Sequence, residues 1–359
     1  MRNIKNLLVI TKRGELMNIK HIYTIILGFI VFTQPMFGAI PENAKIYVSG
    51  HRGLVGSALV KKLCANGFTN IILRTSKELD LRNQAAVETF FAKEQPEYVF
   101  HIAAKVGGIN ANMKSPADFM CDNLKIITNV IDSAYKYGTK KLVYIGSSCI
   151  YPRLCPQPIK EESLLSAPLE PTNEAYAIAK IAGLKLCQAF NRQYGTTFVS
   201  CMLPNLYGPG DNFNLETSHV LPALLVKIYQ AKQEGRKSAS IWGTGKVLRE
   251  FLYVDDVAEA LMFLMENYNE NEIINIGTGE AISIAELANL IKKIVGYEGT
   301  LVFDTTKPDG TPCKVMDVTR INALGWHATH TLEAGIRKML EWYKANYNIK
   351  ENTILPNTN

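Results

Sequence analysis

A series of three glycines near the start of the chain limits the possible fold more than any other feature. Gly50, Gly53 and Gly56 follow a run of β-forming residues at positions 45–49 and precede an apolar helical pattern. A strand, a glycine-rich turn and a helix in this order let backbone N–H groups approach a pyrophosphate, which side chains would block. The spacing therefore predicts a dinucleotide-binding turn, formed by Gly50, His51, Arg52, Gly53, Leu54, Val55 and Gly56.

Strand-like and helix-like stretches alternate along the rest of the chain. Further strands are expected at residues 70–74, 98–102, 142–146, 198–203 and 273–277, and further helices at 123–137 and 283–295. This alternation predicts an α/β fold with a Rossmann-type, doubly wound parallel sheet. We expect a leader at 1–43, a dinucleotide-binding domain at 44–204, a smaller α/β substrate-binding lobe at 205–345 that returns to the sheet near 250–295, and a tail at 346–359.

Basic residues follow the second predicted strand, where charge selects between NAD and NADP. An acidic residue there would hold the ribose 2′-hydroxyl of NAD, whereas arginine accepts the 2′-phosphate of NADP. In this chain Arg74 and Lys77 take that place, Arg52 lies in the glycine turn, and no carboxylate occurs between Arg74 and Glu78. We therefore expect NADP(H) as the cofactor. The alternative is that Arg74 and Lys77 are ordinary surface charges.

Tyr176 and Lys180 are spaced so that a helix would place them on one face. A lysine near a tyrosine favours the phenolate and lowers the pKa of the tyrosine, which can then give a proton to a carbonyl as hydride arrives. Ser147, in a serine run after the fourth predicted strand, supplies a hydroxyl that can hold the substrate oxygen. Together the three residues predict carbonyl reduction.

Seven short runs distributed over the chain carry a closer likeness. They are GHRGLVG (50–56), AAKVGG (103–108), GSSCIYP (146–152), LEPTNEAYAIAKIAG (169–183), NLYGPGDNF (205–213), REFLYVDD (249–256) and KPDGTP (307–312). From about residue 45 to about residue 342 the chain resembles the GDP-L-fucose synthases of the extended short-chain dehydrogenase/reductase superfamily. The resemblance implies a homodimer that epimerises GDP-4-keto-6-deoxy-D-mannose at carbons 3 and 5 and then reduces carbon 4 with NADPH to give GDP-L-fucose.

The same resemblance assigns roles to individual positions. It implies Ser147, Tyr176 and Lys180 as the reduction set, with Cys149 as the base and His219 as the acid of epimerisation. Cofactor contacts implied besides the glycine turn and Arg74 are Ile145, Gly146, Ser147, Ser148, Lys180, Leu203, Pro204, Asn205, Leu206 and His219; substrate contacts are Lys227, Trp242, Arg249 and Asp309. Lys227 and Arg249 suit a diphosphate. Trp242 suits a flat ring, although core packing is an equal alternative.

Two departures from the family pattern affect the cofactor site. The chain reads LPNL at 203–206 where PTNL is expected, and it has Ser76 where a basic residue is expected. The second departure leaves Arg52, Arg74 and Lys77 to hold a 2′-phosphate and weakens the preference for NADP.

Two other functions compete with this reading. The first is another nucleotide-sugar enzyme of the superfamily, a 4-epimerase or a 4,6-dehydratase. The dehydratases look as if they carry a Thr-Asp-Glu run where this chain has Ser147, Ser148 and Cys149, and the lack of that acidic residue argues against a dehydratase. The second is a non-catalytic NADP-sensing protein. Such proteins tend to lose the tyrosine or the lysine, and this chain keeps Tyr176 and Lys180.

Composition limits the partners and the compartment. The net charge of +6 comes with no basic tract interleaved with aromatics, so nucleic acid is not expected. The 7 cysteines form no CxxC pair, so we expect no metal site and free thiols in the cytoplasm. The apolar run at 22–32 is short for a membrane span. It is open to three readings: a signal-like segment, an anchor in contact with a membrane, or a mis-assigned start before Met17.

Overall fold

The computed structural model describes residues 9–10, 16–17, 40–307, 309–348 and 353–354. The chain divides into two units, Met1–Ala39 and Ile40–Asn359. In the first unit, β1 (Val9–Ile10) pairs antiparallel with β2 (Leu16–Met17). The apolar run at 22–32 lies outside the described residues. Within the described part of the chain, no helix is both long and apolar enough to cross a bilayer.

Six parallel strands form the central sheet of the second unit, in the order β12-β7-β6-β5-β3-β4. They are β3 (Ile46–Ser49), β4 (Ile71–Ile72), β5 (Tyr98–His101), β6 (Lys141–Ile145), β7 (Phe198–Met202) and β12 (Ile274–Asn275). All residues of β3, β6 and β7 are buried, as expected for parallel strands covered on both faces. The predicted Rossmann-type α/β fold is confirmed.

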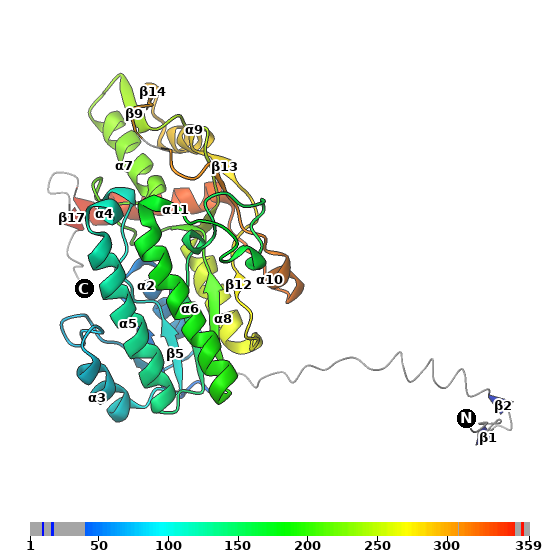
Figure 1. Cartoon of the computed structure of the whole chain (residues 1–359). Coiled ribbons are helices and arrows are strands. Elements are labelled where there is room, and N and C mark those ends of the chain that lie inside the picture. Colours follow the sequence, from blue (N-terminus) through cyan, green and yellow to red (C-terminus); the bar gives the residue numbers. More distant parts are fainter. Residues whose placement is uncertain (1–8, 11–15, 18–39, 308, 349–352, 355–359) are drawn as a thin grey trace. The chain divides into compact units, whose positions relative to one another are not determined.

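Helices cover both faces of this sheet. On one face α2 (Leu54–Ala65) packs against α8 (Val254–Asn267); on the other, α5 (Pro116–Lys136) packs between α3 (Gln84–Glu94) and α6 (Glu174–Tyr194). Figure 1 shows α5 and α6 side by side in front of the sheet. Because β4 and β5 lie on opposite sides of β3, the strand order reverses there, and open α/β sheets bind ligands at such a point.

A smaller α/β lobe surrounds a third apolar core. It contains α7 (Val220–Gln233), α9 (Ile284–Val295), α11 (Leu332–Asn346), and the parallel pair β9 (Ser238–Trp242) and β14 (Thr300–Asp304). Two further small sheets join it to the first lobe: β13 (Ile282–Ser283), β10 (Leu248–Arg249) and β15 (Cys313–Lys314), and the pair β8 (Asn205–Tyr207) and β11 (Phe251–Tyr253).

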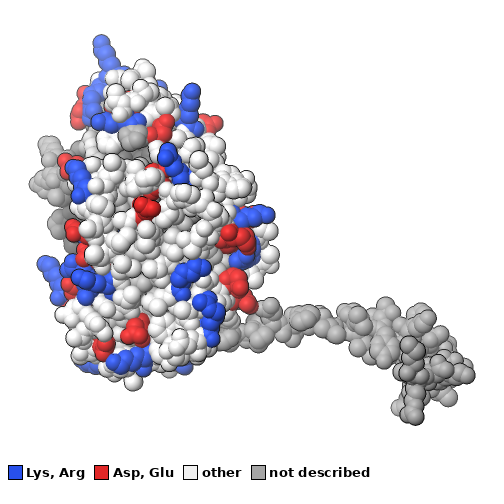
Figure 2. Space-filling model, viewed as in Figure 1, with Lys and Arg blue, Asp and Glu red and all other residues white. Residues whose placement is uncertain are grey.

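The remaining described elements are short. They are α4 (Ile109–Lys114), α10 (Thr319–Ala323), β16 (Tyr347–Asn348), β17 (Thr353–Ile354) and the 3-10 helices η1 (Ser148–Ile150), η2 (Glu161–Ser163) and η3 (Pro171–Asn173). Helix α5 begins earlier than predicted, because Pro116 is well tolerated in the first helical turn. Figure 2 shows charges of both signs interspersed on one face of this unit. The proposed domain boundaries stay a prediction.

Buried Asn275 anchors the segment that follows β6 to the edge of the central sheet. Its Nδ2 donates to the carbonyls of Ile159 (2.9 Å) and Asp317 (3.1 Å). Its Oδ1 accepts from the Tyr151 hydroxyl at 2.6 Å, and its N–H donates to Glu161 Oε1 at 2.9 Å. Asn275 therefore joins β12 to two segments that lie more than 40 positions from it along the chain.

Replacing Asn275 with leucine should destabilise the protein strongly. The substitution keeps the N–H bond but leaves the Tyr151 hydroxyl and the Asp317 carbonyl without partners, at about 1–3 kcal/mol for each buried group left unsatisfied. The Ile159 carbonyl still accepts from Asp317 N at 2.8 Å. Urea unfolding followed by circular dichroism measures the loss. Asn289→Ala is the control, because Asn289 bonds only at an exposed helix surface, to Ala285 O. Equal stability of the two variants would contradict an anchoring role for Asn275.

Candidate active site

A cleft of about 1700 Å³ opens at the carboxyl ends of the central strands, between the sheet and the smaller lobe. Every residue predicted to act in catalysis or binding lines this cleft, apart from Gly56. Segments from residue 50 to residue 314 contribute to its walls. The structure thus brings the predicted site residues together, while their individual roles stay predictions.

The glycine turn joins β3 to α2 through two close backbone approaches. Gly50 has φ +76°, and a Cβ there would lie 3.0 Å from the backbone of Ala103. Gly56 is absent from the cleft wall because it packs directly beneath the turn, where a Cβ would collide with the Gly50 carbonyl. Gly53 begins α2 without a side-chain cap, and the first turn of that helix has no acidic residue. The N-terminal N–H groups of α2 are therefore suited to a pyrophosphate.

The basic residues beyond β4 differ in how they are held. The Arg74 guanidinium donates to Glu94 Oε1 (2.8 Å) and Leu73 O (2.7 Å), so it is already paired while lining the cleft. Within the described part of the chain, no ion pair engages Arg52 or Lys77, which are both exposed. The Glu78 carboxylate accepts from Thr75 N and Oγ1, and these hydrogen bonds hold its pKa below the ordinary value.

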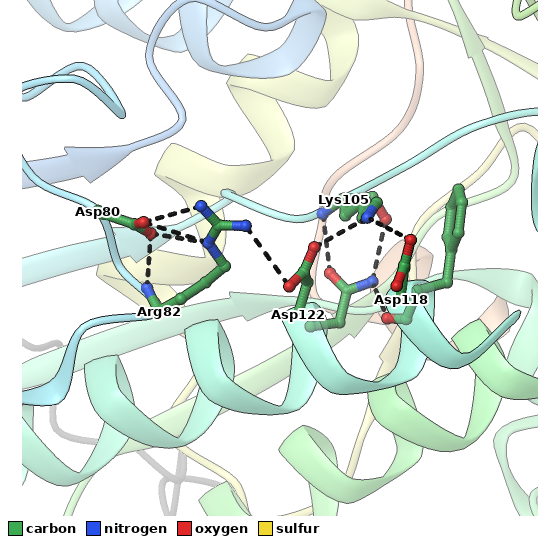
Figure 3. Close-up of polar contacts among 7 residues, drawn as sticks. Asp80, Arg82, Lys105, Asp118 and Asp122 are labelled. Carbon is green, nitrogen blue, oxygen red and sulfur yellow. Dashed lines mark hydrogen bonds and ion pairs between the residues drawn. The ribbon is translucent and has the colours of Figure 1, made fainter. Parts of the chain in front are cut away.

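Figure 3 shows a series of charged contacts that the sequence did not reveal, and four of its members line the cleft: Asp80, Arg82, Lys105 and Asp122. Arg82 donates to both oxygens of Asp80 at 2.8–2.9 Å and lies 3.6 Å from Asp122. Lys105 Nζ donates to Asp122 at 2.8 Å and lies 3.8 Å from Asp118, while the backbone of Lys105 bonds to buried Asn123. These contacts fix the 103–108 run against α5. No spacing rule links Lys105 to α5, so sequence reasoning had no signal for them.

The reduction set lies where β6 ends. Ser147 precedes η1, and its Oγ accepts from Cys149 N at 3.3 Å. Tyr176 and Lys180 face this point from the first turns of α6; Lys180 Nζ lies 5.9 Å from the Tyr176 ring centroid and donates to Ile145 O at 2.9 Å. Burial lowers the pKa of Lys180 to about 8.

The expected lowering of the tyrosine pKa is not what the structure gives. Burial raises the pKa of Tyr176, and the charge of Cys149 raises it further. Lys180 donates to a backbone carbonyl, and its Nζ lies 5.9 Å from the centroid of the Tyr176 ring, so desolvation is the larger effect on the tyrosine. Tyr176 is therefore held protonated, as an acid.

Cys149 and His219 approach the cleft from different elements. Cys149 is buried in η1, and burial raises the pKa of its thiol, against the opposing effects of Lys314, Ser147 and Lys180. His219 begins α7 in the smaller lobe. Its side chain is exposed to the cleft, yet the surrounding walls lower its pKa by desolvation, and Lys314 lowers it further.

At the far end of the cleft an aromatic surface is flanked by cations. Trp242 is 52% exposed, so the core-packing alternative is wrong. The Nζ atoms of Lys227 and Lys307 lie 4.8 and 5.4 Å from its ring centroid. Sequence reasoning missed Lys307 although it opens the 307–312 run, and it missed Lys314 just beyond that run.

Asp309 and Arg249 hold each other in this end of the cleft. Both Asp309 carboxylate oxygens accept from Thr244, at 2.8 Å from its N and from its Oγ1. Arg249 Nη2 donates to Asp309 O at 3.2 Å. Asp309 therefore links the Thr244 loop to Arg249, through its carboxylate on one side and its carbonyl on the other.

Comparison with known proteins agrees with this geometry. The NAD dependent epimerase/dehydratase family matches residues 46–277. The chain is 56% identical over 305 residues to GDP-L-fucose synthase 1 of Arabidopsis thaliana, covering 85% of this chain and 94% of that one.

Two solved structures extend the likeness. A GDP-6-OMe-4-keto-L-xylo-heptose reductase from C. jejuni is 42% identical with a TM-score of 0.83, covering 86% of this chain and 99% of that one. A GDP-L-fucose synthetase from Naegleria fowleri, bound to NADP, is 33% identical with a TM-score of 0.79, covering 86% and 96%. This chain therefore belongs to the GDP-L-fucose synthase family, within the wider NAD dependent epimerase/dehydratase family.

Proposed function

We propose that this chain converts GDP-4-keto-6-deoxy-D-mannose to GDP-L-fucose, as a 3,5-epimerase and an NADPH-dependent 4-reductase. One observation carries the proposal: a reduction set (Ser147, Tyr176 and Lys180) and a separate acid–base pair (Cys149 and His219) line one cleft. A simple reductase requires only the first. The identity to a plant GDP-L-fucose synthase supports the same activity.

The residues of the glycine turn fit NADP(H). The uncapped N-terminus of α2 and the close approach at Gly50 suit the pyrophosphate, and the buried His51 Nδ1 has no hydrogen-bond partner among the described residues. Arg52 and Lys77 suit the 2′-phosphate, with Arg74 behind them. The bound cofactor supplies hydride to carbon 4.

Reduction requires a proton for the oxygen at carbon 4. Tyr176, which burial keeps protonated, donates that proton, and Ser147 holds the same oxygen by a hydrogen bond. Lys180 is fixed by Ile145 O in the position from which it supports Tyr176.

Epimerisation requires a base and an acid on different sides of the sugar. The keto group at carbon 4 makes the C–H bonds at carbons 3 and 5 acidic. Cys149 takes the proton from the side of the sheet, and His219, from α7, returns a proton from the side of the smaller lobe. Lys227 and Arg249 bind the diphosphate, and Trp242 offers its exposed ring to a flat group.

We also propose that the enzyme is a cytoplasmic homodimer that pairs through α5 and α6. Tyr135, Ile178 and Tyr194 expose large apolar side chains on these helices, at 36%, 40% and 48% of their surface. The described structure has seven free cysteines, which suits a reducing compartment. Sedimentation of the purified protein tests the dimer, and mass spectrometry of the natural N-terminus tests the compartment.

Two substitutions should separate the two half-reactions. Tyr176→Phe removes the proton donor, so NADPH oxidation should fall roughly 10²–10⁴-fold while solvent deuterium still enters carbons 3 and 5. Cys149→Ser should slow that deuterium uptake, whereas a keto-sugar that is already epimerised should still be reduced. NMR of the sugar and absorbance at 340 nm follow the two steps. His219→Gln should stall the second half of epimerisation. Exchange at the wild-type rate in Cys149→Ser would make Cys149 a packing residue.

The rate of reduction should fall as the pH rises past about 8. Lys180 is charged below its pKa, which burial lowers to about 8, so its ammonium is lost above that value. Initial rates of NADPH oxidation between about pH 6 and pH 10 measure this. Lys180→Arg, charged at every pH in this range, should shift the alkaline fall upward at a lower absolute rate. An unchanged profile in Lys180→Arg would show that another group titrates.

Arg52→Ala should weaken NADPH binding and hardly change NADH binding. Loss of a charge-assisted contact to the 2′-phosphate, at about 1.5–3 kcal/mol, raises KM for NADPH about tenfold or more. Arg74→Ala should act in the same direction but also loosen α3, because Arg74 pairs with Glu94. Lys61→Ala, at an exposed site outside the cleft, is the control. Equal use of both cofactors by the wild type would refute the NADP preference.

A further inference from the structure

The thiol that the proposed function uses as a base lies where ionisation is unfavourable. Cys149 is only 6% exposed, and burial raises the pKa of its thiol above the ordinary value. A thiol removes a proton from carbon only as the thiolate. The site therefore needs a cation close to Cys149 that no other group neutralises.

Two lysines that line the cleft interact electrostatically with Cys149, and Lys180 is the one whose ammonium is held in place by a hydrogen bond. Lys180 donates to Ile145 O at 2.9 Å and lies 5.1 Å from the centroid of the Tyr144 ring. Lys314 lines the same cleft, and within the described part of the chain its Nζ takes part in no hydrogen bond or ion pair. Among the groups that oppose the burial of Cys149, the charge of Lys314 acts most strongly.

The backbone around Lys314 is joined to the segment that follows Cys149. Ile159 N donates to Val315 O at 2.8 Å, and Val315 N donates to Gln157 Oε1 at 3.0 Å. Glu250 Oε2 accepts from Met316 N at 2.7 Å. The strand that carries Lys314 is thus fixed to the loop that leaves η1, although 165 positions separate Lys314 from Cys149 in sequence.

Among the described residues, the other charged groups near Lys314 leave it without a close counter-charge. Arg249 is its register partner in the parallel pair β10–β15, so both cations leave the same face of the strands. The Glu170 carboxylate is shared with Arg153 (3.3 Å), Thr172 and Thr311. His219 and Cys155 complete the titratable groups that interact with Lys314.

We propose that Lys314 is the cation that holds Cys149 as a thiolate and so positions the base of the epimerisation step, an inference that rests on the proposed function. The step balances without another reactant. The Cys149 thiolate takes the proton from the carbon beside the keto group, the electron pair of that C–H bond passes to the oxygen at carbon 4, and Lys314 keeps its own proton throughout.

The pH dependence of Cys149 alkylation tests this directly. Iodoacetamide reacts with the thiolate, and mass spectrometry of the peptide that contains Cys149 separates it from the other six cysteines. In Lys314→Met and Lys314→Gln the midpoint should move to higher pH, and the alkylation rate at pH 7 should fall about tenfold or more, because a nearby opposite charge shifts a pKa by about one to three pH units. Lys314→Arg should retain most of the wild-type rate. Lys185→Met, which removes an exposed lysine from α6, is the matched control.

Activity measurements separate this inference from the proposed function. Lys314→Met should slow deuterium uptake at carbons 3 and 5 about tenfold while an epimerised keto-sugar is still reduced. An unchanged alkylation midpoint in both neutral variants overturns the inference; a raised KM for the GDP-sugar alongside it would assign Lys314 to the diphosphate. If the wild type fails to turn over the GDP-sugar but the midpoint still shifts, the proposed function fails while the pairing of Lys314 with Cys149 stands.

Discussion

The close approach of backbone to backbone where β3 and β5 diverge is the constraint on which the rest of the site depends. Buried Ser49, the last residue of β3, accepts from the N–H groups of Ile102 and Ala103 at 3.0 and 3.2 Å. This contact holds the Gly50 turn and the 103–108 run on either side of one opening. A side chain at position 50 would crowd the backbone of Ala103, so this position favours glycine. The smaller lobe lies over that opening, and the space between the two forms the cleft.

Local features of the sequence were sufficient to predict the Rossmann-type sheet and the placement of Tyr176 and Lys180 on one helix. The strand, turn and helix around Gly50 are contiguous, and Tyr176 and Lys180 are neighbours on α6 because one helical turn separates them. Buried parallel strands such as β6 are also recognisable in the sequence as apolar runs. In each case the information lies within about 20 residues, which is the range over which periodicity and turn chemistry act.

The remaining part of the site comes from contacts between distant segments, and the sequence offers no rule for these. Lys314 reaches the cleft only because β15 pairs with β10, and Arg82 meets Asp122 only because α5 packs beside it. The position of a residue in the sequence also failed to predict some of its interactions. Arg74 has the expected place beyond β4, yet it is already paired with Glu94 on α3. For Tyr176, proximity to Lys180 predicted a lower pKa, but burial proved the larger effect.

Desolvation gives these separate groups a common behaviour. The cleft raises the pKa values of Tyr176 and Cys149 and lowers those of Lys180 and Lys314, so each group is biased toward its neutral form. A neutral acid such as Tyr176 is ready to donate, whereas a neutral thiol is inactive as a base. With Cys149 as the proposed base and Tyr176 as the proposed acid, epimerisation depends on a compensating charge in a way that reduction does not. In the proposed mechanism the diphosphate brings negative charge to the end of the cleft that holds Arg249, the register partner of Lys314, and so favours the charged form of Lys314. In that mechanism the binding of the anionic substrate is coupled, through Lys314, to the ionisation of Cys149.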